Sequence, residues 1–300
     1  MTPRKPRISI GMPVYNGARF LREALDSIVT QRFEDFELVI SDNASSDETE
    51  EICREYLARD KRIRYSRNET NIGLYRNCNR TFRLCSGEYF KLAASDDVCH
   101  RDLVARCVEA LDDDPTAVLA YPKTIFIGAD GKELPFRDPG WDLRSESARE
   151  RMGYVIRSGH RVNVFFGLMR AQALAKTRLF PAYSSGDYRL LGELSLLGKF
   201  IEVPEQLFYR RIHQEASSQS TSTESQAEYF KGTTGPSLLP LWHLCFDHSL
   251  SIVRSELSLG QKLALIGSVT NRMIFSTGQL LQELAIAFNA YAKVVSRANN

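Results

Sequence analysis

The chain has 300 residues, of which 43% are hydrophobic and 25% charged, and its formal net charge is +2. This composition predicts a globular protein of one large domain or two modest ones, and the small net charge argues against nucleic acid as a partner. Six cysteines without CxxC spacing indicate reduced thiols, and no apolar segment predicts a signal peptide or membrane span, so we expect a cytoplasmic protein.

The first part of the sequence alternates between short apolar segments and segments with helical spacing. Strands are expected at 8–14, 36–40, 62–65 and 88–93, and helices at 18–29, 47–57, 72–84 and 102–111. Such alternation with short connections predicts the α/β class, with a mostly parallel sheet covered by helices on both faces. Ligands of these sheets bind beyond the carboxyl ends of the strands.

The pattern changes after Pro115. Further strands are expected at 118–127 and 133–136 around a hairpin turn at 129–132, and then at 163–169, 200–203 and 207–212. Helices are expected at 144–157 and at 188–197, the second ended by Gly198. Residues 1–215 then form one domain. Residues 216–237 are rich in Ser, Thr, Gln and Gly, which predicts a linker or mobile loop before a helical region at 238–300.

The last predicted helix carries one apolar stripe, because its apolar residues recur at alternating three- and four-residue steps. They are Leu281, Leu284, Phe288, Tyr291 and Val295. We expect this stripe to pack against the α/β region. A homodimer seam and a peripheral membrane contact are the alternatives, and the second is favoured by basic residues near the stripe. These are Lys262, Arg272, Lys293 and Arg297.

Polar and aromatic residues follow the first two predicted strands. Pro13 and Tyr15, with Asn16 beside them, could form the wall of a pocket for a planar ligand, and Asp42 could accept a hydrogen bond from a ring N–H. Alternatively, Pro13 ends a strand and Asp42 stabilises a turn or caps a helix. Because these residues lie at equivalent ends of two strands, we favour binding.

Two adjacent carboxylates, Asp96 and Asp97, follow the strand predicted at 88–93. Mg²⁺ and Mn²⁺ prefer oxygen ligands and are often held by one or two carboxylates together with phosphates. Such a cation can neutralise a departing diphosphate. The ordinary alternative is that the pair caps the helix beginning near Asp102. Their place past a buried strand favours the metal site.

Seven short motifs, in this order and spacing, resemble those of the family 2 glycosyltransferases. They are 13–17, 41–47, 71–73, 87–89, 95–97, 186–187 and 209–213. The resemblance covers about residues 7 to 213 and implies a GT-A nucleotide-diphospho-sugar transferase fold with a C-terminal helical extension. It departs from the family at Ala94, where many members carry an acidic residue.

The resemblance implies a metal-dependent, inverting transfer of a sugar from a nucleoside-diphosphate donor to a hydroxyl of a saccharide or lipid-linked saccharide. The setting it implies is bacterial cell-surface polysaccharide or glycolipid biosynthesis, peripheral to the inner face of the plasma membrane. The nucleotide-binding residues that it implies are Pro13, Tyr15, Asn16, Asp42, Asn71, Gly73, Ser95 and Asp96. Asp96, Asp97 and His213 would hold Mg²⁺ or Mn²⁺.

By the same resemblance, Asp187 removes the proton from the acceptor hydroxyl. Asp187 precedes an apolar helix, so it is also a good helix-capping residue. A helix N-terminus stabilises a carboxylate and weakens it as a base, whereas burial raises its pKa. Arg210 and Arg211 could donate to phosphate oxygens, and one of them is expected to be a surface residue.

Two other functions are compatible with parts of the sequence. A nucleotidyltransferase on a related fold would carry a Gly-rich, Arg-containing loop after the first strand, which residues 12–16 do not provide. A nucleotide-sugar-binding protein without catalysis is supported only by Ala94.

Overall fold

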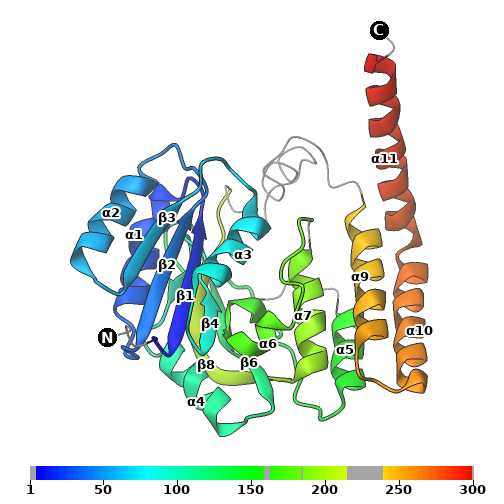
Figure 1. Cartoon of the computed structure of the whole chain (residues 1–300), viewed down its shortest axis with the longest axis horizontal. Coiled ribbons are helices and arrows are strands. Elements are labelled where there is room, and N and C mark those ends of the chain that lie inside the picture. The colour runs from blue at the N-terminus through cyan, green and yellow to red at the C-terminus, as the bar shows by residue number, and fades with distance from the viewer. Residues whose placement is uncertain (1–4, 159–162, 184, 215–238, 299–300) are drawn as a thin grey trace.

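The computed structural model describes residues 5–158, 163–183, 185–214 and 239–298. Its centre is an eight-stranded sheet with the strand order β3-β2-β1-β4-β7-β6-β8-β5, with helices packed around it (Figure 1). The strands are β1 (Ile8–Val14), β2 (Phe36–Asp42), β3 (Ile63–Arg67), β4 (Tyr89–Leu92), β5 (Val98–Cys99), β6 (Ala117–Ile127), β7 (Leu168–Arg170) and β8 (Lys199–Arg211). The predicted α/β class is confirmed.

The helices follow the strands in the alternation that the sequence predicts. They are α1 (Ala18–Val29), α2 (Thr49–Arg59), α3 (Leu74–Leu84), α4 (Leu103–Asp113), α5 (Ala148–Arg157), α6 (Ala171–Ala175), α7 (Gly186–Leu197), α9 (Pro240–Arg254), α10 (Leu259–Phe275) and α11 (Thr277–Ala298). A short 3-10 helix, η1 (Val164–Phe166), precedes β7. The helix expected at 144–157 begins later, where Ser147 Oγ accepts a hydrogen bond from Glu150 N and caps α5.

The first half of the sheet is parallel. β1 lies between β2 and β4 and runs parallel to both, and all seven residues of β1 and of β2 are buried. Strands buried on both faces consist of nearly continuous apolar residues, which is why the sequence predicted them well. The carboxyl ends of β1, β2 and β4 therefore lie at one edge of the sheet.

The second half of the sheet contains antiparallel pairs. β7 is antiparallel to both β4 and β6, β8 is parallel to β6, and β5 is antiparallel to β8. β5 directly follows Asp97, and its pairs Val98↔Tyr209 and Cys99↔Phe208 bring the end of β8 next to the acidic pair. The topology thus joins residues that are more than a hundred positions apart in the sequence.

Three strand predictions in this half were wrong. The segment 163–169 forms η1 and β7 in place of one strand, and the hairpin expected at 133–136 is reduced to a single bridge, Ile127↔Glu133. The strands expected at 200–203 and 207–212 are one strand, β8. There the pairing steps from Pro122↔Val203 to Lys123↔Gln206, so a bulge accommodates Pro204 and Glu205 between them.

Gly198 ends α7 as predicted, but for another reason. With a φ of −177°, Gly198 has an extended backbone that any residue can adopt, so a left-handed conformation is not the reason for glycine here. A Cβ at this position would lie 2.5 Å from the carbonyl oxygen of Thr116, so the close approach of the chain requires glycine.

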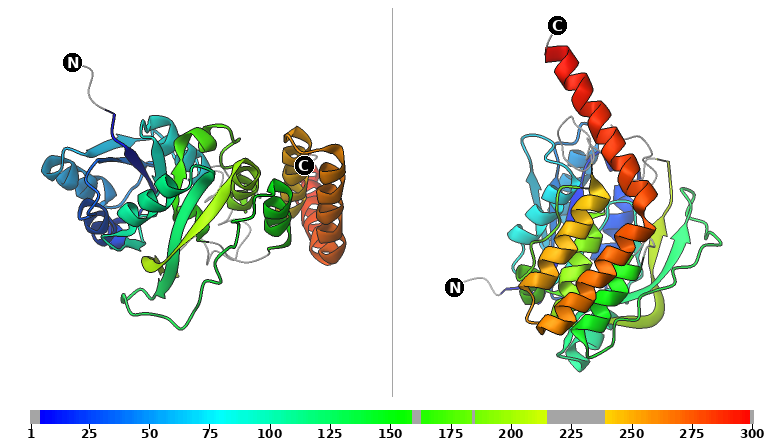
Figure 2. Two further views of the ribbon diagram at one scale, coloured as in Figure 1. Left: turned by 90° about the horizontal axis from the view of Figure 1, so that it is seen from below. Right: turned by 90° about the vertical axis from the view of Figure 1, so that its right-hand side faces the viewer.

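The C-terminal helices α9, α10 and α11 pack beside α5 and α7 (Figure 2). A second apolar cluster fills this contact and consists of Met152, Ile156, Leu241, Cys245, Ile252, Leu265, Val269 and Leu280. The linker predicted at 216–237 lies outside the described residues. In the described ranges, no helix is both long and apolar enough to cross a membrane.

A buried ionic cluster also joins α9 to α7 and to the segment before it. Arg178 bonds Glu193 on α7 through Nε at 2.6 Å, and Asp247 on α9 through Nη1 at 2.6 Å. The hydroxyl of Tyr183 donates to Asp247 at 2.6 Å, and Arg189 Nη1 lies 3.5 Å from the same carboxylate. The backbone that leads into the start of α7 is therefore held by α9.

The expectation that the stripe on the last helix packs against the α/β region was wrong. The side chains of Leu281, Leu284, Phe288 and Tyr291 are 60%, 42%, 72% and 68% exposed. Among the residues of α11 whose side chains are described, Leu280 and Glu283 are buried, and they lie beside the stripe rather than on it. The side chain of Val295, the fifth member, lies outside the described set.

Candidate functional site

The turn after β1 and the loop after β2 interlock at the carboxyl edge of the sheet. Asn16 has a positive φ of 49°, its Oδ1 accepts from Ser46 N at 2.8 Å, and its own N–H donates to Ser45 Oγ at 2.9 Å. Gly17 N donates to Thr49 Oγ1 at 3.0 Å. Side chains of the second loop thus satisfy the backbone donors of the first, including the free N–H groups at the start of α1.

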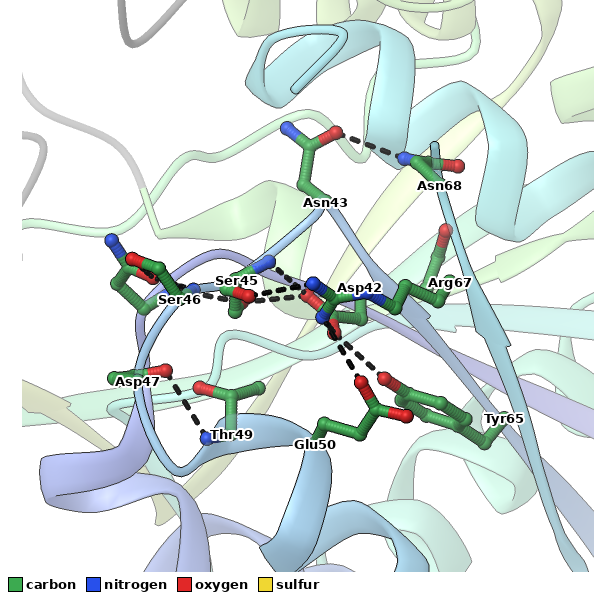
Figure 3. Close-up of polar contacts among 12 residues, drawn as sticks. Asp42, Asn43, Ser45, Ser46, Asp47, Thr49, Glu50, Tyr65, Arg67 and Asn68 are labelled. Atoms are coloured by element: carbon green, nitrogen blue, oxygen red, sulfur yellow. Dashed lines mark hydrogen bonds and ion pairs between the residues drawn. The ribbon is translucent and has the colours of Figure 1, made fainter. Parts of the chain in front are cut away.

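Asp42 is the centre of the second loop and is fully buried (Figure 3). Its Oδ1 accepts from the backbone N–H and the hydroxyl of Ser45, at 2.9 and 2.6 Å. Its Oδ2 accepts from Tyr65 OH and from Arg67 Nη1, both at 2.7 Å. Burial alone would raise the pKa of Asp42, but these donors hold the pKa below its ordinary value.

The structural role that the sequence offered for Asp42 is therefore present. A carboxylate has about four acceptor sites, and Asp42 fills all four within the loop. For Asp42 to accept from a nucleobase, one of these donors would have to leave. Arg67 is the most accessible of them, with 37% of its side chain exposed.

Asn71 and Gly73 build the neighbouring wall. Asn71 Oδ1 accepts from Asn43 Nδ2 at 2.6 Å and from Gly73 N at 2.8 Å, and Asn43 Oδ1 accepts from Ile72 N at 2.9 Å. Gly73 precedes α3 with a φ of 83°, a left-handed conformation that favours glycine. The structure thus brings both residues to the same edge as Asp42.

The remaining residues predicted to bind nucleotide lie at this edge with different exposure. Pro13 is buried inside β1 and pairs with Ser41 of β2, so it offers no open face. The ring of Tyr15 is 40% exposed and can offer one. Ser95 lies against the turn, because a Cβ on Gly17 would come 3.1 Å from Ser95 Oγ.

Asp96 and Asp97 lie between β4 and β5, in contact with the end of β8. Asp96 Oδ2 is 3.0 Å from His213 Nε2, and the ring of His213 packs 4.8 Å from that of Phe20. Asp97 Oδ1 accepts from the backbone N–H of Arg211 at 2.8 Å. The predicted grouping of Asp96, Asp97 and His213 is therefore present in space.

The negative charges of Asp96 and Asp97 repel each other, and burial of Asp97 leaves little solvent to screen that repulsion. Burial, and then the charge of Asp96, raise the pKa of Asp97 well above its ordinary value, although Arg210, the Arg211 N–H and Lys91 oppose the shift. A cation would relieve this repulsion. Within the described ranges, Asp96 and Asp97 each accept a hydrogen bond on one carboxylate oxygen. The other oxygen of each is therefore available to a cation. His213 Nδ1 is also buried without a partner among the described residues.

These donors fit Mg²⁺ or Mn²⁺ only as part of a coordination shell. In the described residues, no group of three or more His, Cys, Asp or Glu side chains is arranged to hold a metal ion. Mg²⁺ commonly takes one or two carboxylates and completes its shell with substrate phosphates and water. The acidic pair matches that arrangement, with His213 orienting Asp96.

Asp187 lies in the first turn of α7 and is half-buried. Burial raises its pKa to about 6, although hydrogen bonds with backbone groups at Tyr188 and Asp187 and the charge of Arg210 oppose the shift. The sequence leaves open whether the helix N-terminus or burial has the larger effect on the pKa of Asp187. In the structure the effect of burial is the larger. A carboxylate with this pKa is a better general base than an ordinary aspartate and is still ionised at neutral pH.

The two arginines at the end of β8 have separate roles. Arg211 is buried and structural, since its Nε donates to the Asp96 carbonyl at 2.9 Å and its Nη2 pairs with Glu23 at 2.5 Å. Arg210 is half-buried, and its charge lowers the pKa of both Asp97 and Asp187. Arg210 therefore lies near both carboxylates. Neither arginine is an exposed residue, so the expectation that one of the pair is a surface residue was wrong.

Sequence analysis missed two residues beneath the site. Lys91 is fully buried in β4, and its Nζ donates to the carbonyls of Phe166 and, at 3.3 Å, of Leu92. Asn163 accepts from Arg210 Nη1 and donates to Asp138 at 2.7 Å, which ties the start of η1 to the site. A lysine inside an apolar strand is a visible signal for the first, whereas nothing in the sequence distinguishes Asn163.

Comparison with known sequences gives one family. A sequence model of Glycosyl transferase family 2 matches residues 9–173. The chondroitin synthase of Escherichia coli is 27% identical over 230 residues, which are 76% of this chain and 32% of that protein. The hyaluronan synthase of Pasteurella multocida is 26% identical over 215 residues, which are 72% of this chain and 21% of that protein. The chain therefore spans about a third or less of these curated relatives.

Comparison with solved structures gives the same architecture. TarS 1-349 of S. aureus, in complex with UDP-GlcNAc, superposes with a TM-score of 0.66 at 19% identity, covering 89% of this chain and 72% of that one. The mannosyltransferase PcManGT of Pyrobaculum calidifontis, in complex with GDP-Man and Mn²⁺, gives a TM-score of 0.57 at 15% identity, covering 98% and 81%. At these identities the likeness establishes the fold.

Proposed function

The chain belongs to glycosyl transferase family 2 and has the GT-A fold, and from this premise we propose that it is a metal-dependent, inverting glycosyltransferase. It moves a sugar from a nucleoside-diphosphate donor to a hydroxyl group. The observation that supports the proposal best is the grouping of Asp96, Asp97 and His213 at the end of β8, with Arg210 close enough to lower the pKa of both Asp97 and Asp187. A diphosphate beside Arg210 would place the sugar between the leaving group and the base.

In this proposal the donor nucleotide lies along the carboxyl edge of β1, β2 and β4. Tyr15 stacks on the base, while the loops that carry Asp42 and Asn71 set the width of the pocket. Arg210 donates to the diphosphate as a fork of N–H groups. Asp96 and Asp97 would hold a divalent cation, which would neutralise charge on the leaving diphosphate.

The acceptor hydroxyl enters from the side of α7 and η1. Asp187 accepts its proton as the oxygen attacks the anomeric carbon, and the bond to the diphosphate breaks on the opposite face. A single displacement inverts the anomeric centre. Lys91 and Arg211 are not assigned a substrate contact in this proposal. Arg211 holds the backbone of Asp96, and the charge of Lys91 lowers the pKa of Asp97.

The relatives suggest the substrate class. Structural neighbours are solved with UDP-GlcNAc and with GDP-Man, and curated relatives are named as synthases of chondroitin and hyaluronan. We therefore propose a uridine or guanosine diphosphate sugar as donor and a saccharide or lipid-linked saccharide as acceptor, in bacterial cell-surface polysaccharide or glycolipid biosynthesis.

The first test is a thermal-shift panel of nucleotides with and without Mn²⁺. A ligand that binds only the folded state increases the free energy of unfolding by about 2.7 kcal/mol at a hundredfold excess over Kd, and so raises the melting temperature. We expect one nucleoside diphosphate to stabilise the protein, and Mn²⁺ to increase that shift. Equal shifts for all nucleotides, or none, would contradict a nucleotide-sugar site.

Asp42→Ala is expected to lower both stability and donor affinity. It leaves Tyr65 and Arg67 without their acceptor, and an unsatisfied buried polar group costs about 1 to 3 kcal/mol. Donor affinity should fall more than turnover at saturation, because the loop is remote from the bond that breaks. Steady-state kinetics with varied donor and a melting curve measure the two effects.

Glu37 provides the matched control at the other end of β2. It accepts from Ser9 Oγ at 2.6 Å, from Ser86 N at 2.9 Å and from Arg64 at 2.8 Å, away from the carboxyl edge. Glu37→Ala should lower the melting temperature in a similar way and leave the KM for donor unchanged. If the two variants lose donor affinity equally, the effect of Asp42 is only structural.

A further inference from the structure

The guanidinium of Arg210 is held by the segment that carries η1. Its Nη1 donates to the side-chain oxygen of Asn163, and its Cζ lies 5.7 Å from the centre of the Phe166 ring. Asn163 directly precedes η1 and Phe166 ends it, and both residues are buried. The direction of the Arg210 side chain is therefore set by the protein itself.

These contacts do not cancel the charge of Arg210. Its neighbour Arg211 forms an ion pair with Glu23, whereas within the described residues no carboxylate pairs with Arg210. The acceptor on Asn163 is a neutral amide, and a guanidinium has five N–H donors. Arg210 is thus oriented through one of its nitrogens and keeps its positive charge and its remaining donors for an anionic ligand.

Asp138 fixes which way the amide of Asn163 points. Asn163 Nδ2 donates to Asp138 Oδ2 at 2.7 Å. Because a carboxylate only accepts and a guanidinium only donates, the amide must turn its nitrogen to Asp138 and its oxygen to Arg210. The carboxylate therefore acts on the arginine through an amide, without a direct ion pair.

The loop between β6 and α5, which carries Asp138, is anchored to the sheet. The hydroxyl of Tyr121 on β6 donates to the Trp141 carbonyl at 2.6 Å and accepts from Trp141 N at 2.8 Å. Both of these aromatic residues are buried. β6 pairs with β8, whose end carries Arg210. The position of Asp138 is therefore fixed relative to Arg210.

We propose that Asn163 and Asp138 are positioning residues for the transfer. Asp138 orients the amide of Asn163, and the amide oxygen aims Arg210 at the diphosphate of the donor while leaving the charge of Arg210 unpaired. Neither residue touches the substrate, so each acts only through Arg210. The inference rests on the proposed function, because it needs an anionic donor beside Arg210.

The test is a calorimetric titration of the full chain with UDP and with GDP in the presence of Mn²⁺. For the diphosphate that binds the parent, we expect Asn163→Ala to raise the Kd about tenfold, because an arginine that is no longer aimed loses much of a charge-assisted hydrogen bond. Asp138→Ala should also raise the Kd. Asp138→Asn should restore most of the binding, since its amide oxygen can still accept from Asn163 Nδ2.

A double-mutant cycle with Arg210→Met shows whether Asn163 acts through the arginine. Methionine keeps an apolar stem against Phe166 and removes the guanidinium. In the Arg210→Met background, Asn163→Ala should change the Kd by less than about twofold, because no guanidinium is left to aim. A residue that only stabilised the fold would have its full effect in both backgrounds.

Gln31→Ala is the matched control, at the end of α1 that is remote from the site. Gln31 is a buried amide that accepts from Val104 N at 3.1 Å and donates to the His100 carbonyl at 2.9 Å. Its removal should lower the melting temperature, as the removal of a buried polar side chain does in general, and leave the Kd for the diphosphate unchanged.

The outcomes separate this inference from the reaction on which it rests. If the parent binds a diphosphate and Asn163→Ala and Asp138→Ala bind it equally well, the inference is wrong and the proposed function stands. Equal losses in Asn163→Ala and Gln31→Ala, or a full effect of Asn163→Ala in the Arg210→Met background, would also overturn it. A parent that binds neither UDP nor GDP would contradict the proposed function, and the inference with it.

Discussion

Replacing Asp187 by Asn is expected to lower the rate of sugar transfer by a factor of about 10² to 10⁴, the usual contribution of a general base. Asn is also well tolerated at the start of a helix, and its amide oxygen can accept the same backbone hydrogen bonds at Asp187 and Tyr188 while the basic carboxylate is lost. The proposed donor contacts lie at the carboxyl ends of β1, β2 and β4 and at Arg210 of β8, and none of them is changed in this variant. We therefore expect the melting temperature and the Kd for donor to stay close to those of the parent.

The pH profile gives this prediction a second readout. Because burial raises the pKa of Asp187 to about 6, the parent should lose activity as pH falls through 6 and Asp187 takes up a proton. The Asn variant should lack this limb in its residual activity. Glu150→Gln, which removes a carboxylate from the first turn of α5, is the control and should leave the profile unchanged. A variant with near-normal transfer would place the base elsewhere.

Replacing Asp97 by Asn is expected to abolish metal-dependent donor binding. Asn can still accept the hydrogen bond from Arg211 N, so the backbone stays in place while half of the acidic pair is removed. Without metal the variant should melt at a higher temperature than the parent at pH 8, because the repulsion between the buried carboxylate of Asp97 and that of its neighbour Asp96 is gone. Titration with Mn²⁺ and melting curves measure both effects.

The sign of the pH effect follows from the raised pKa of Asp97. Between its ordinary value, about 4, and the raised value, the folded protein binds more protons than the unfolded chain. Parent stability without metal should therefore decrease as pH rises through this range, and Mn²⁺ should restore it. Asp102→Asn removes a carboxylate that is paired with Arg32 at 2.8 Å, and should keep the Mn²⁺ response. If Asp97→Asn binds donor as the parent does, and a chelator has no effect, the metal assignment is wrong.

The sequence predicted the parallel first half of the sheet and its helices closely. The strand expected at 8–14 has the bounds of β1, and the helix at 18–29 those of α1, because apolar runs and amphipathic spacing report burial directly. The grouping of Asp96, Asp97 and His213 depended on family motifs. Nothing local predicts that β5 pairs with β8, which brings them together.

The predictions that failed concern features that depend on how distant parts of the chain pack together. The bulge at 204–205 interrupts the alternation of β8, so one strand resembled two. The distinction between Arg210 and Arg211 depends on the face to which each points, and neighbouring residues of a strand point to opposite faces. The stripe on α11 shows a helix with an apolar side, and the pattern cannot show whether the protein itself covers that side.

The cluster around Asp247 bears on whether the C-terminal helices form an independent unit. Arg178, Arg189 and Glu193 belong to the part of the chain that carries the proposed base, and their two positive charges and one negative charge are balanced only with the carboxylate of Asp247 on α9. Removing one partner of such a buried ionic group costs about 3 to 5 kcal/mol, a large share of the stability of a domain. A chain cut before α9 would leave these charges unbalanced next to the start of α7. We therefore expect a chain that lacks the C-terminal helices to be much less stable than the full chain, because α7 and the segment before it are built to pack against α9.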